Sequence, residues 1–200
     1  SSIENCVNGL QVEGPTVGGI AGYINNSSIT ECVNEAPVTG TGTASTAYAG
    51  GICGNVSSGS EITYCQNTEG IYGKSFAGGI AGSLASNTVS KACMNVGNVE
   101  ASGGAKKQGS IVGKSSNGKI LSCLSYVEGS DLFITGTAGA SDTYDGNFYL
   151  GEDDETYGMP LTEGEFKHIS LVGDLNQSLG ENFWGFGYED DTYQYPIFAD

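Results

Sequence analysis

The sequence predicts an all-β fold, a single-stranded parallel β-helix of about five coils that winds right-handed and ends in a C-terminal cap with a short helix. Three observations predict it. A glycine box recurs at intervals of about thirty residues, a cysteine follows each box at a near-constant distance, and inward-type residues recur at every second position after each cysteine. A fixed period of this length indicates stacked units, each too small to bury its own apolar face.

The glycine box has the form Gly-Gly-Ile-x-Gly and occurs four times, with a degenerate last copy. The four copies are Gly18–Gly22, Gly50–Gly54, Gly78–Gly82 and Gly109–Gly113. A second motif follows six or seven residues later, with an apolar residue, a cysteine and a small polar residue. Its five copies are Ile3/Cys6/Asn8, Ile29/Cys32/Asn34, Ile62/Cys65/Asn67, Val89/Cys93/Asn95 and Ile120/Cys123/Ser125.

The residues after each cysteine alternate with period two, which is strand geometry. The second copy gives Cys32, Asn34, Ala36, Val38 and Gly40. Stacked coils place equivalent residues about 4.8 Å apart, so we expect two inward structural ladders. The thiol ladder comprises Cys6, Cys32, Cys65, Cys93 and Cys123, and the amide ladder comprises Asn8, Asn34, Asn67 and Asn95. A buried asparagine needs hydrogen-bond partners, and stacked amides with corner carbonyls supply them.

The cysteines allow two interpretations. Six cysteines would indicate a disulfide framework if the chain were a small secreted fold. Cα atoms about 4.8 Å apart on neighbouring coils leave a bridge geometrically allowed. The five cysteines of one inward column, however, cannot all pair. We favour stacked, buried, reduced thiols that pack as small apolar groups. The sequence lacks the Cys-x-x-Cys spacing of a structural zinc site.

Together, the glycine box, the Ile-x-x-Cys-x-Asn motif and the Gly/Val strand resemble the GLUG-motif repeat. That repeat occurs in bacterial surface proteins and in non-catalytic parts of IgA-cleaving metallopeptidases. The resemblance covers residues 1–130. It implies a parallel β-helix, an exported protein at the bacterial cell surface or outside the cell, and a role in adhesion or display. It implies no catalytic residue.

Residues 131–200 are expected to form a last altered coil and an aromatic, acidic C-terminal cap. Asn147 stands in the cysteine position of the altered coil. Thr162 followed by Glu165 predicts a helix N-terminus, and Phe166, Ile169, Val172 and Leu175 recur at steps of three. The aromatics after Asn182 are expected to lie over the last coil and to cover its open edge.

Charge excludes several partners. The chain has 23 acidic residues, seven lysines, no arginine and a net charge of −16. Nucleic acid and anionic membranes require a cationic footprint, so neither is an expected partner. No apolar run reaches the roughly 20 residues of a membrane span.

Candidate chemistry is sparse. His168 is the single histidine and is expected on an exposed helix face away from Phe166. The acidic runs Glu152–Glu155 and Glu189–Asp191, and Asp142 with Asp145, match no calcium-binding motif. No cofactor is therefore expected, although a calcium site in an acidic loop stays open. Aromatics near the strand links could stack on sugar rings, and Tyr48, Tyr72 and Phe76 are the candidate ligand-binding residues. The alternative is that they shield strand edges.

Three functions remain open. The first is a non-catalytic surface module that binds a host protein or glycan. The second is a carbohydrate-active β-helix enzyme that uses paired carboxylates; β-helical polysaccharide lyases generally need a basic residue near the scissile bond, and the chain has no arginine. The third is a structural spacer whose partners are neighbouring domains of a longer chain, because the sequence begins inside a repeat. We favour the first hypothesis and expect no enzymatic activity.

Overall fold

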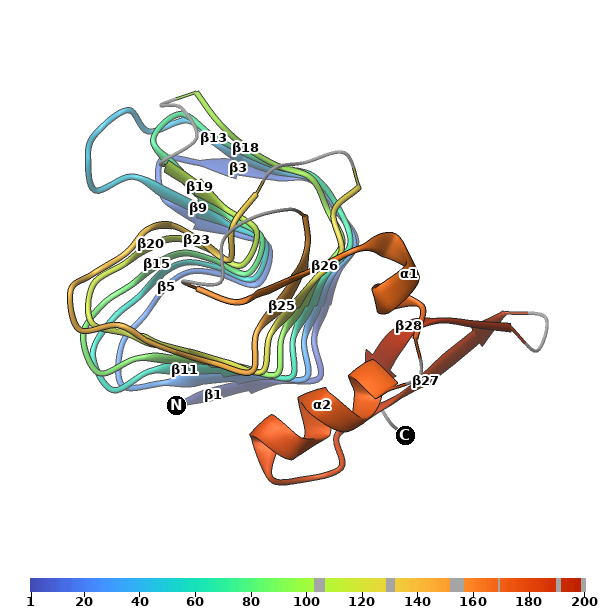
Figure 1. Ribbon diagram of the computed structural model, residues 1–200. Coiled ribbons are helices and arrows are strands. Elements are labelled where there is room, and N and C mark those ends of the chain that lie inside the picture. The colour runs from blue at the N-terminus through green and yellow to red at the C-terminus, as the bar shows by residue number, and fades with distance from the viewer. Residues whose placement is uncertain (103–106, 129–131, 152–156, 169, 190–191, 199–200) are drawn as a thin grey trace.

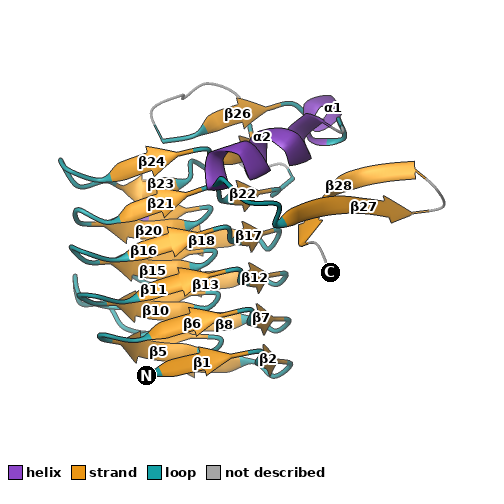
Figure 2. Ribbon diagram, turned by 90° about the horizontal axis from the view of Figure 1, so that it is seen from below, coloured by secondary structure: helices purple, strands orange, loops and turns teal. Residues whose placement is uncertain are grey.

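The computed structural model shows a β-solenoid of about five turns, with parallel strands stacked along one axis (Figures 1 and 2). It describes residues 1–102, 107–128, 132–151, 157–168, 170–189 and 192–198. Seen from the C-terminal end in Figure 1, the chain runs anticlockwise while successive coils advance toward the viewer, so the winding is right-handed. The predicted all-β parallel β-helix is confirmed.

Each full coil contains five short strands. In the first coil they are β1 (Ser2–Glu4), β2 (Val7–Asn8), β3 (Val12–Gly14), β4 (Val17–Gly18) and β5 (Ala21–Ile24). Equivalent strands of successive coils pair in parallel and build five sheets, each named after its first strand. The register places Ile3 beside Ile29 and Ile29 beside Ile62. In the fourth coil Ser90 lies beside Ile62, so Val89 does not occupy the apolar position expected for it.

The strands of the first two sheets are as follows. The β1 sheet continues with β6 (Ser28–Thr30), β11 (Glu61–Thr63), β16 (Val89–Lys91), β21 (Lys119–Leu121) and β24 (Thr143–Asp145). The β2 sheet continues with β7 (Val33–Asn34), β12 (Gln66–Asn67), β17 (Met94–Asn95), β22 (Leu124–Ser125), β25 (Phe148–Leu150) and β26 (Met159–Leu161).

The other three sheets complete the coil. The β3 sheet continues with β8 (Val38–Gly40), β13 (Ile71–Gly73) and β18 (Val99–Ala101). The β4 sheet continues with β9 (Tyr48–Gly50), β14 (Phe76–Gly78) and β19 (Gln108–Gly109). The β5 sheet continues with β10 (Cys53–Val56), β15 (Ala81–Leu84), β20 (Val112–Ser115) and β23 (Thr135–Thr137).

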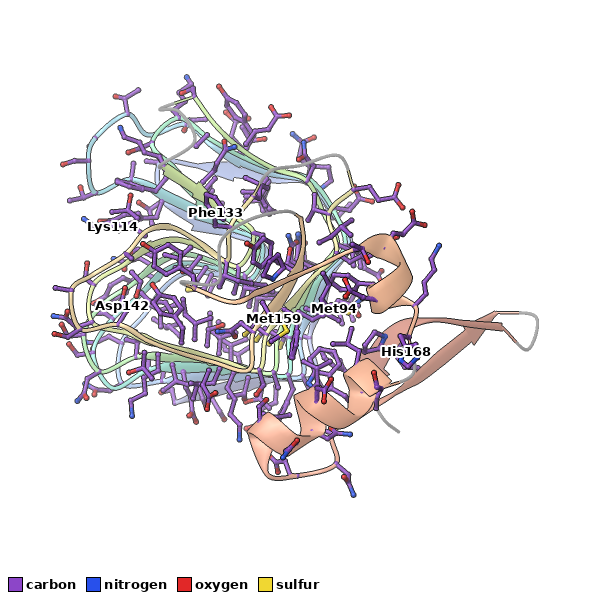
Figure 3. All side chains as sticks on the ribbon, in the orientation of Figure 1. Met94, Lys114, Phe133, Asp142, Met159 and His168 are labelled. Carbon is purple, nitrogen blue, oxygen red and sulfur yellow. The ribbon has the colours of Figure 1, made fainter. Side chains whose placement is uncertain are left out.

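The corner between the β1 and β2 sheets contains the thiol column. The residue before each cysteine has a left-handed backbone, for example Glu31 with φ 53° and Ala92 with φ 51°. This turn points each thiol inward, where its Sγ donates to the carbonyl two residues earlier, as Cys65 does to Thr63 at 3.2 Å. In the altered coil, Gly146 has φ +60° and Asn147 replaces the cysteine, accepting the backbone N–H of Cys123 at 2.9 Å. Figure 3 shows a row of sulfur atoms, drawn in yellow, near the centre of the solenoid.

The asparagines form a continuous ladder inside the β2 sheet. Asn8 donates to Asn34 at 2.7 Å, Asn34 to Asn67 at 2.7 Å, and Asn67 to Asn95 at 2.8 Å. Each buried asparagine also donates to a carbonyl two residues later, as Asn34 does to Ala36 at 2.7 Å. Asn34, Asn67 and Asn95 are fully buried, so these bonds offset the cost of removing their amides from water.

The coil is indented, and the indentation divides the interior into two apolar cores (Figure 1). One core lies between the β1 and β5 sheets and includes Ile29, Val56 and Ile62. The other lies between the β3 and β4 sheets and includes Val38 and Ala49. The second glycine of the first three boxes stands at the narrow point between the cores, facing the ladder: a Cβ on Gly51 would lie 2.6 Å from Asn67 Cγ. Glycine is required there because the opposite wall is too close for a side chain.

The C-terminal segment contains β26, two helices and a hairpin. The helices are α1 (Glu163–Phe166) and α2 (Ser170–Leu179), and the hairpin joins β27 (Trp184–Glu189) to β28 (Thr192–Phe198). Thr162 and Glu165 form the expected capping box at α1. Phe166, Val172 and Leu175 are buried, whereas Ile169 lies outside the described residues. His168 is exposed, as expected, but it lies between the two helices and not on a helix face (Figure 3).

This segment packs mainly on the flank of the solenoid, which differs from the expected position over the last coil. Phe166, Leu175 and Trp184 join a core with Met94, Leu124 and Phe148 from the outer face of the β2 sheet. The strand β26 pairs with β25 and so continues the β2 sheet at its end. Figure 2 shows α2 and the hairpin beside the stacked coils. The segment packs there because the outer face of the β2 sheet carries large apolar side chains, and their burial is favourable.

Candidate functional site

Tyr48 and Phe76 lie one above the other on neighbouring strands of the β4 sheet. They pair in register, and their ring centroids are 5.8 Å apart with a 38° tilt. Both residues face the outer side of the indentation, where the β4 and β5 sheets meet along a line that we name the seam. Each is 8% exposed.

The last glycine of each box brings the two sheets together at the seam. A Cβ on Gly82 would lie 2.7 Å from Tyr48 Cβ and 2.8 Å from the nitrogen of Ala49. A Cβ on Gly113 would lie 2.7 Å from the oxygen of Ala77. The strands that carry Tyr48 and Phe76 therefore lie directly against the backbone of the β5 sheet.

Two lysines converge on Phe76. The Nζ of Lys107 lies 5.5 Å from the ring centroid, and the Nζ of Lys114 lies 5.4 Å from it. Lys107 stands level with Phe76 on the next coil of the β4 sheet, because Ala77 pairs with Gln108. Lys114 comes from β20 in the facing β5 sheet. Figure 3 shows Lys114 at the outer mouth of the indentation. Cation–π attraction holds both ammonium groups beside the ring.

The column that contains Lys114 begins with an exposed tyrosine. Tyr23 pairs with Asn55, Asn55 with Ser83, and Ser83 with Lys114 on successive coils of the β5 sheet. Tyr23 is 57% exposed. With about 4.8 Å per coil, the column from Tyr23 to Lys114 spans roughly 14 Å. We define the seam patch as Tyr23, Tyr48, Phe76, Lys107 and Lys114.

Tyr72 does not belong to this patch. It lies on β13, between Thr39 and Glu100 on the outer face of the β3 sheet, and is 38% exposed. The structure therefore brings Tyr48 and Phe76 together and places Tyr72 on a different face. A shallow cavity of about 230 Å³ beside Tyr72 is lined by Pro37, Gly70 and Asn98.

Neither lysine of the seam patch was expected from the sequence motifs. Aligning the repeats on their glycine boxes reveals the two columns to which these lysines belong. The residue two positions before the box is Tyr48, Phe76 and then Lys107, and the residue directly after it is Tyr23, Asn55, Ser83 and then Lys114. The alternation of side chains along a strand does not show that these two columns face each other. Their relative position depends on how the coil bends at the glycine box.

The thiols have no features of a nucleophilic site. Cys32, Cys53, Cys65, Cys93 and Cys123 are fully buried, and Cys6 is exposed at the open N-terminal end. Burial raises the pKa of Cys53 to about 12 and raises the pKa values of Cys32, Cys93 and Cys123. A protonated thiol is a weak nucleophile and a poor metal ligand, so the column is suited to packing.

Among the acidic candidates, Asp142 is held by hydrogen bonds within the loops around it. Asp142 accepts hydrogen bonds from Ser115, Gly118, Gly139 and Tyr144, with distances between 2.6 and 3.0 Å. Asp145 is exposed. Within the described ranges, no group of three metal-ligating side chains comes together. The run Glu152–Glu155 and residues Asp190 and Asp191 lie outside the described residues.

One further polar cluster joins the solenoid to the C-terminal segment. Glu181 accepts from Lys91 at 2.9 Å and from the hydroxyl of Tyr64 at 2.8 Å, and the ring of Tyr64 stacks on Phe183 at 3.9 Å between centroids. Burial and the bond to Glu181 raise the pKa of Tyr64 to about 12. Hydrogen bonds from Lys91 and Tyr64 lower the pKa of Glu181. The cluster is a structural tie rather than a reactive centre.

Comparison of this chain with protein-family models, with curated proteins and with solved structures gives no match. The resemblance to the GLUG repeat therefore stays a prediction. Neither helix in the described part of the chain has the length and apolar character that a membrane span requires.

Proposed function

We propose that this chain is a non-catalytic module of an exported bacterial surface protein, and that it binds a ligand on the side of a rigid solenoid. One observation carries the proposal. Residues that repeat between coils, such as Asn34 and Asn67, point inward and are fully buried, whereas residues that differ between coils, such as Tyr23 and Lys114, point outward. A constant interior with a variable lateral surface is typical of repeat proteins that bind or display.

Charge and composition are consistent with this role. A net charge of −16 favours a solvated, extended module that does not self-associate. The motifs at Gly18–Gly22 and its copies resemble the GLUG repeat of bacterial surface proteins. The candidate binding surface is the seam patch, because it combines aromatic rings with fixed cations on a rigid sheet.

The test has a location arm and a binding arm. Antibody labelling and protease treatment of intact cells should reach the full-length protein at the cell surface. The purified chain should retain a ligand on a glycan array or a host-protein array. A cytosolic location together with empty arrays would contradict the proposal.

The same cells and purified protein also distinguish two alternative functions. Release of products from acidic polysaccharides, measured by the appearance of reducing or unsaturated ends, would identify a carbohydrate-active enzyme. Deletion of this segment that leaves cell attachment and ligand binding unchanged would identify a structural spacer that links neighbouring domains.

A further inference from the structure

We propose that the seam patch binds carboxylate groups of an acidic polysaccharide, with Lys107 and Lys114 as the cationic contacts. The proposal rests on the ligand-binding function proposed above and names its ligand class. Positive charge gathers at this patch. The chain has a net charge of −16 and only seven lysines, yet the ammonium groups of two of these lysines lie beside the ring of Phe76.

These two ammonium groups have no carboxylate partner in the part of the chain that the structure describes. The ion pairs there join Lys91 to Glu181 and Lys167 to Glu163. Lys107 and Lys114 instead lie 5.5 and 5.4 Å from the centroid of Phe76, so their nitrogens are within about 11 Å of each other. Both ammonium groups therefore attract an anionic chain that passes over the patch.

The patch is preorganised. Phe76 is 8% exposed and packs beside Tyr48, so the ring that both lysines contact is held in place. Lys107 and Lys114 come from opposite sheets that are joined through glycine contacts at Gly113. Binding therefore orders few additional groups, which lowers its entropic cost.

The rest of the column favours a saccharide over a nucleic acid. Tyr23 offers an exposed ring on which a pyranose can stack, and Asn55 places a half-buried amide between Tyr23 and Lys114. Nucleic acid carries a dense charge that needs a wide cationic footprint, which this acidic chain lacks. A uronic-acid chain combines spaced carboxylates with stackable rings and hydroxyls, which matches the column.

The experiment uses the intact chain and a defined oligogalacturonate as the probe, with an uncharged galactose oligomer of equal length as the reference ligand. Binding is measured by titration calorimetry at low salt and again with added NaCl. We expect binding of the oligogalacturonate that weakens as salt screens the ammonium groups, and little binding of the neutral oligomer.

The decisive variant is the double substitution Lys107→Gln with Lys114→Gln, which should weaken binding by about tenfold or more. The control is Lys119→Gln with Lys167→Gln, which changes the net charge by the same amount away from the patch and should leave binding within about twofold. A third variant, Tyr23→Ser, should weaken binding without changing its salt dependence. Circular dichroism and the fluorescence of Trp184 verify folding of each variant.

The outcomes separate this inference from the proposed function. Equal affinity of the Lys107/Lys114 variant and the wild type, or no binding of any uronate, overturns the inference. If a neutral glycan or a protein binds instead, the proposed function stands and the inference fails. If the uronate binds through the two lysines and is also cleaved, the inference stands and the non-catalytic function fails.

Discussion

Asn67 donates from Nδ2 to Oδ1 of Asn95 at 2.8 Å, linking the third coil of the solenoid to the fourth. The same nitrogen donates to the carbonyl of Glu69 at 2.8 Å, and Oδ1 of Asn67 accepts from Asn34 at 2.7 Å. A single fully buried side chain therefore connects three coils and satisfies one corner carbonyl. The ladder fixes the register of the coils as well as contributing to their stability.

The first prediction concerns this central position. Asn67→Ala leaves the carbonyl of Glu69 and the polar atoms of two neighbouring asparagines with fewer partners in a buried site. We expect a loss of about 2–4 kcal/mol in the free energy of unfolding, measured by urea denaturation. Asn98→Ala is the control, because Asn98 is exposed and bonds to the carboxylate of Glu100. Its loss should stay within about 0.5 kcal/mol, and a similar loss for both variants would argue against the ladder.

The second prediction concerns the place where the ladder stops. The register places Ser125 after Asn95 in the ladder column and Ser110 after Gly79 in the box column. Gly79 faces Asn95, since its added Cβ would meet the Asn95 side chain, so Ser110 occupies the position that faces Ser125. The change from glycine to serine on one wall thus accompanies the change from asparagine to serine on the other.

Ser125→Asn should therefore be destabilising on its own, because the side chain of Ser110 occupies the space that a ladder asparagine needs. Adding Ser110→Gly should restore stability and extend the ladder by one amide. It also removes a buried hydroxyl that has no hydrogen-bond partner among the described residues. A double-mutant cycle should give a favourable coupling of about 1–3 kcal/mol. Additive effects of the two substitutions would show that the two walls are independent.

The solenoid could be predicted from the sequence because the motifs that specify it are short and recur in every coil. Period two places Cys32 and Asn34 on one face, and the thirty-residue period stacks them on Cys65 and Asn67. The shape of the coil could not be predicted in the same way. Tyr48 and Tyr72 both precede a glycine box by a few residues, yet the shape of the coil places one in the seam and the other on an open face.

The position of the C-terminal segment depends on a surface rather than on a motif. The outer position directly after each cysteine changes along the chain from Val33 through Gln66 to Met94, Leu124 and Phe148. The larger apolar residues therefore gather on the later coils, where Phe166 and Trp184 cover them. This gradient is visible in the sequence only when the coils are already aligned, and the partner of the surface is far away along the chain.

The third prediction uses the thiol column. In the native protein, a thiol reagent such as DTNB should modify Cys6 rapidly and the other cysteines slowly. Cys6 is exposed, whereas Cys32, Cys53, Cys65, Cys93 and Cys123 are fully buried. Burial also raises the pKa of Cys53 to about 12, which suppresses its thiolate. All six thiols should react after unfolding in guanidinium. Fast modification of several thiols in the native state, or mass loss from disulfides, would contradict the buried, reduced column.

The fourth prediction concerns the tie between Glu181, Lys91 and Tyr64. Hydrogen bonds from Lys91 and Tyr64 lower the pKa of Glu181, so its stabilising contribution is present above about pH 4.5 and is lost as the pH falls through the lowered value. Burial raises the pKa of Tyr64 from 10.0 to about 12. That contribution is therefore present below pH 10 and is lost as the pH rises toward 12. The attachment of the C-terminal segment should weaken at both limits.

Trp184 reports this weakening, because it is the single tryptophan, is 2% exposed and packs in the core between the segment and the β2 sheet. Its emission should shift to the red at acidic and alkaline pH before the far-ultraviolet circular dichroism of the solenoid changes. Glu181→Gln should weaken the attachment already at neutral pH and reduce the acid-dependent step, whereas Glu61→Gln, the same charge change at an exposed position on β11, should leave it in place. If the two optical signals change together in every variant, the segment and the coils unfold as one unit, and the tie has no separate role.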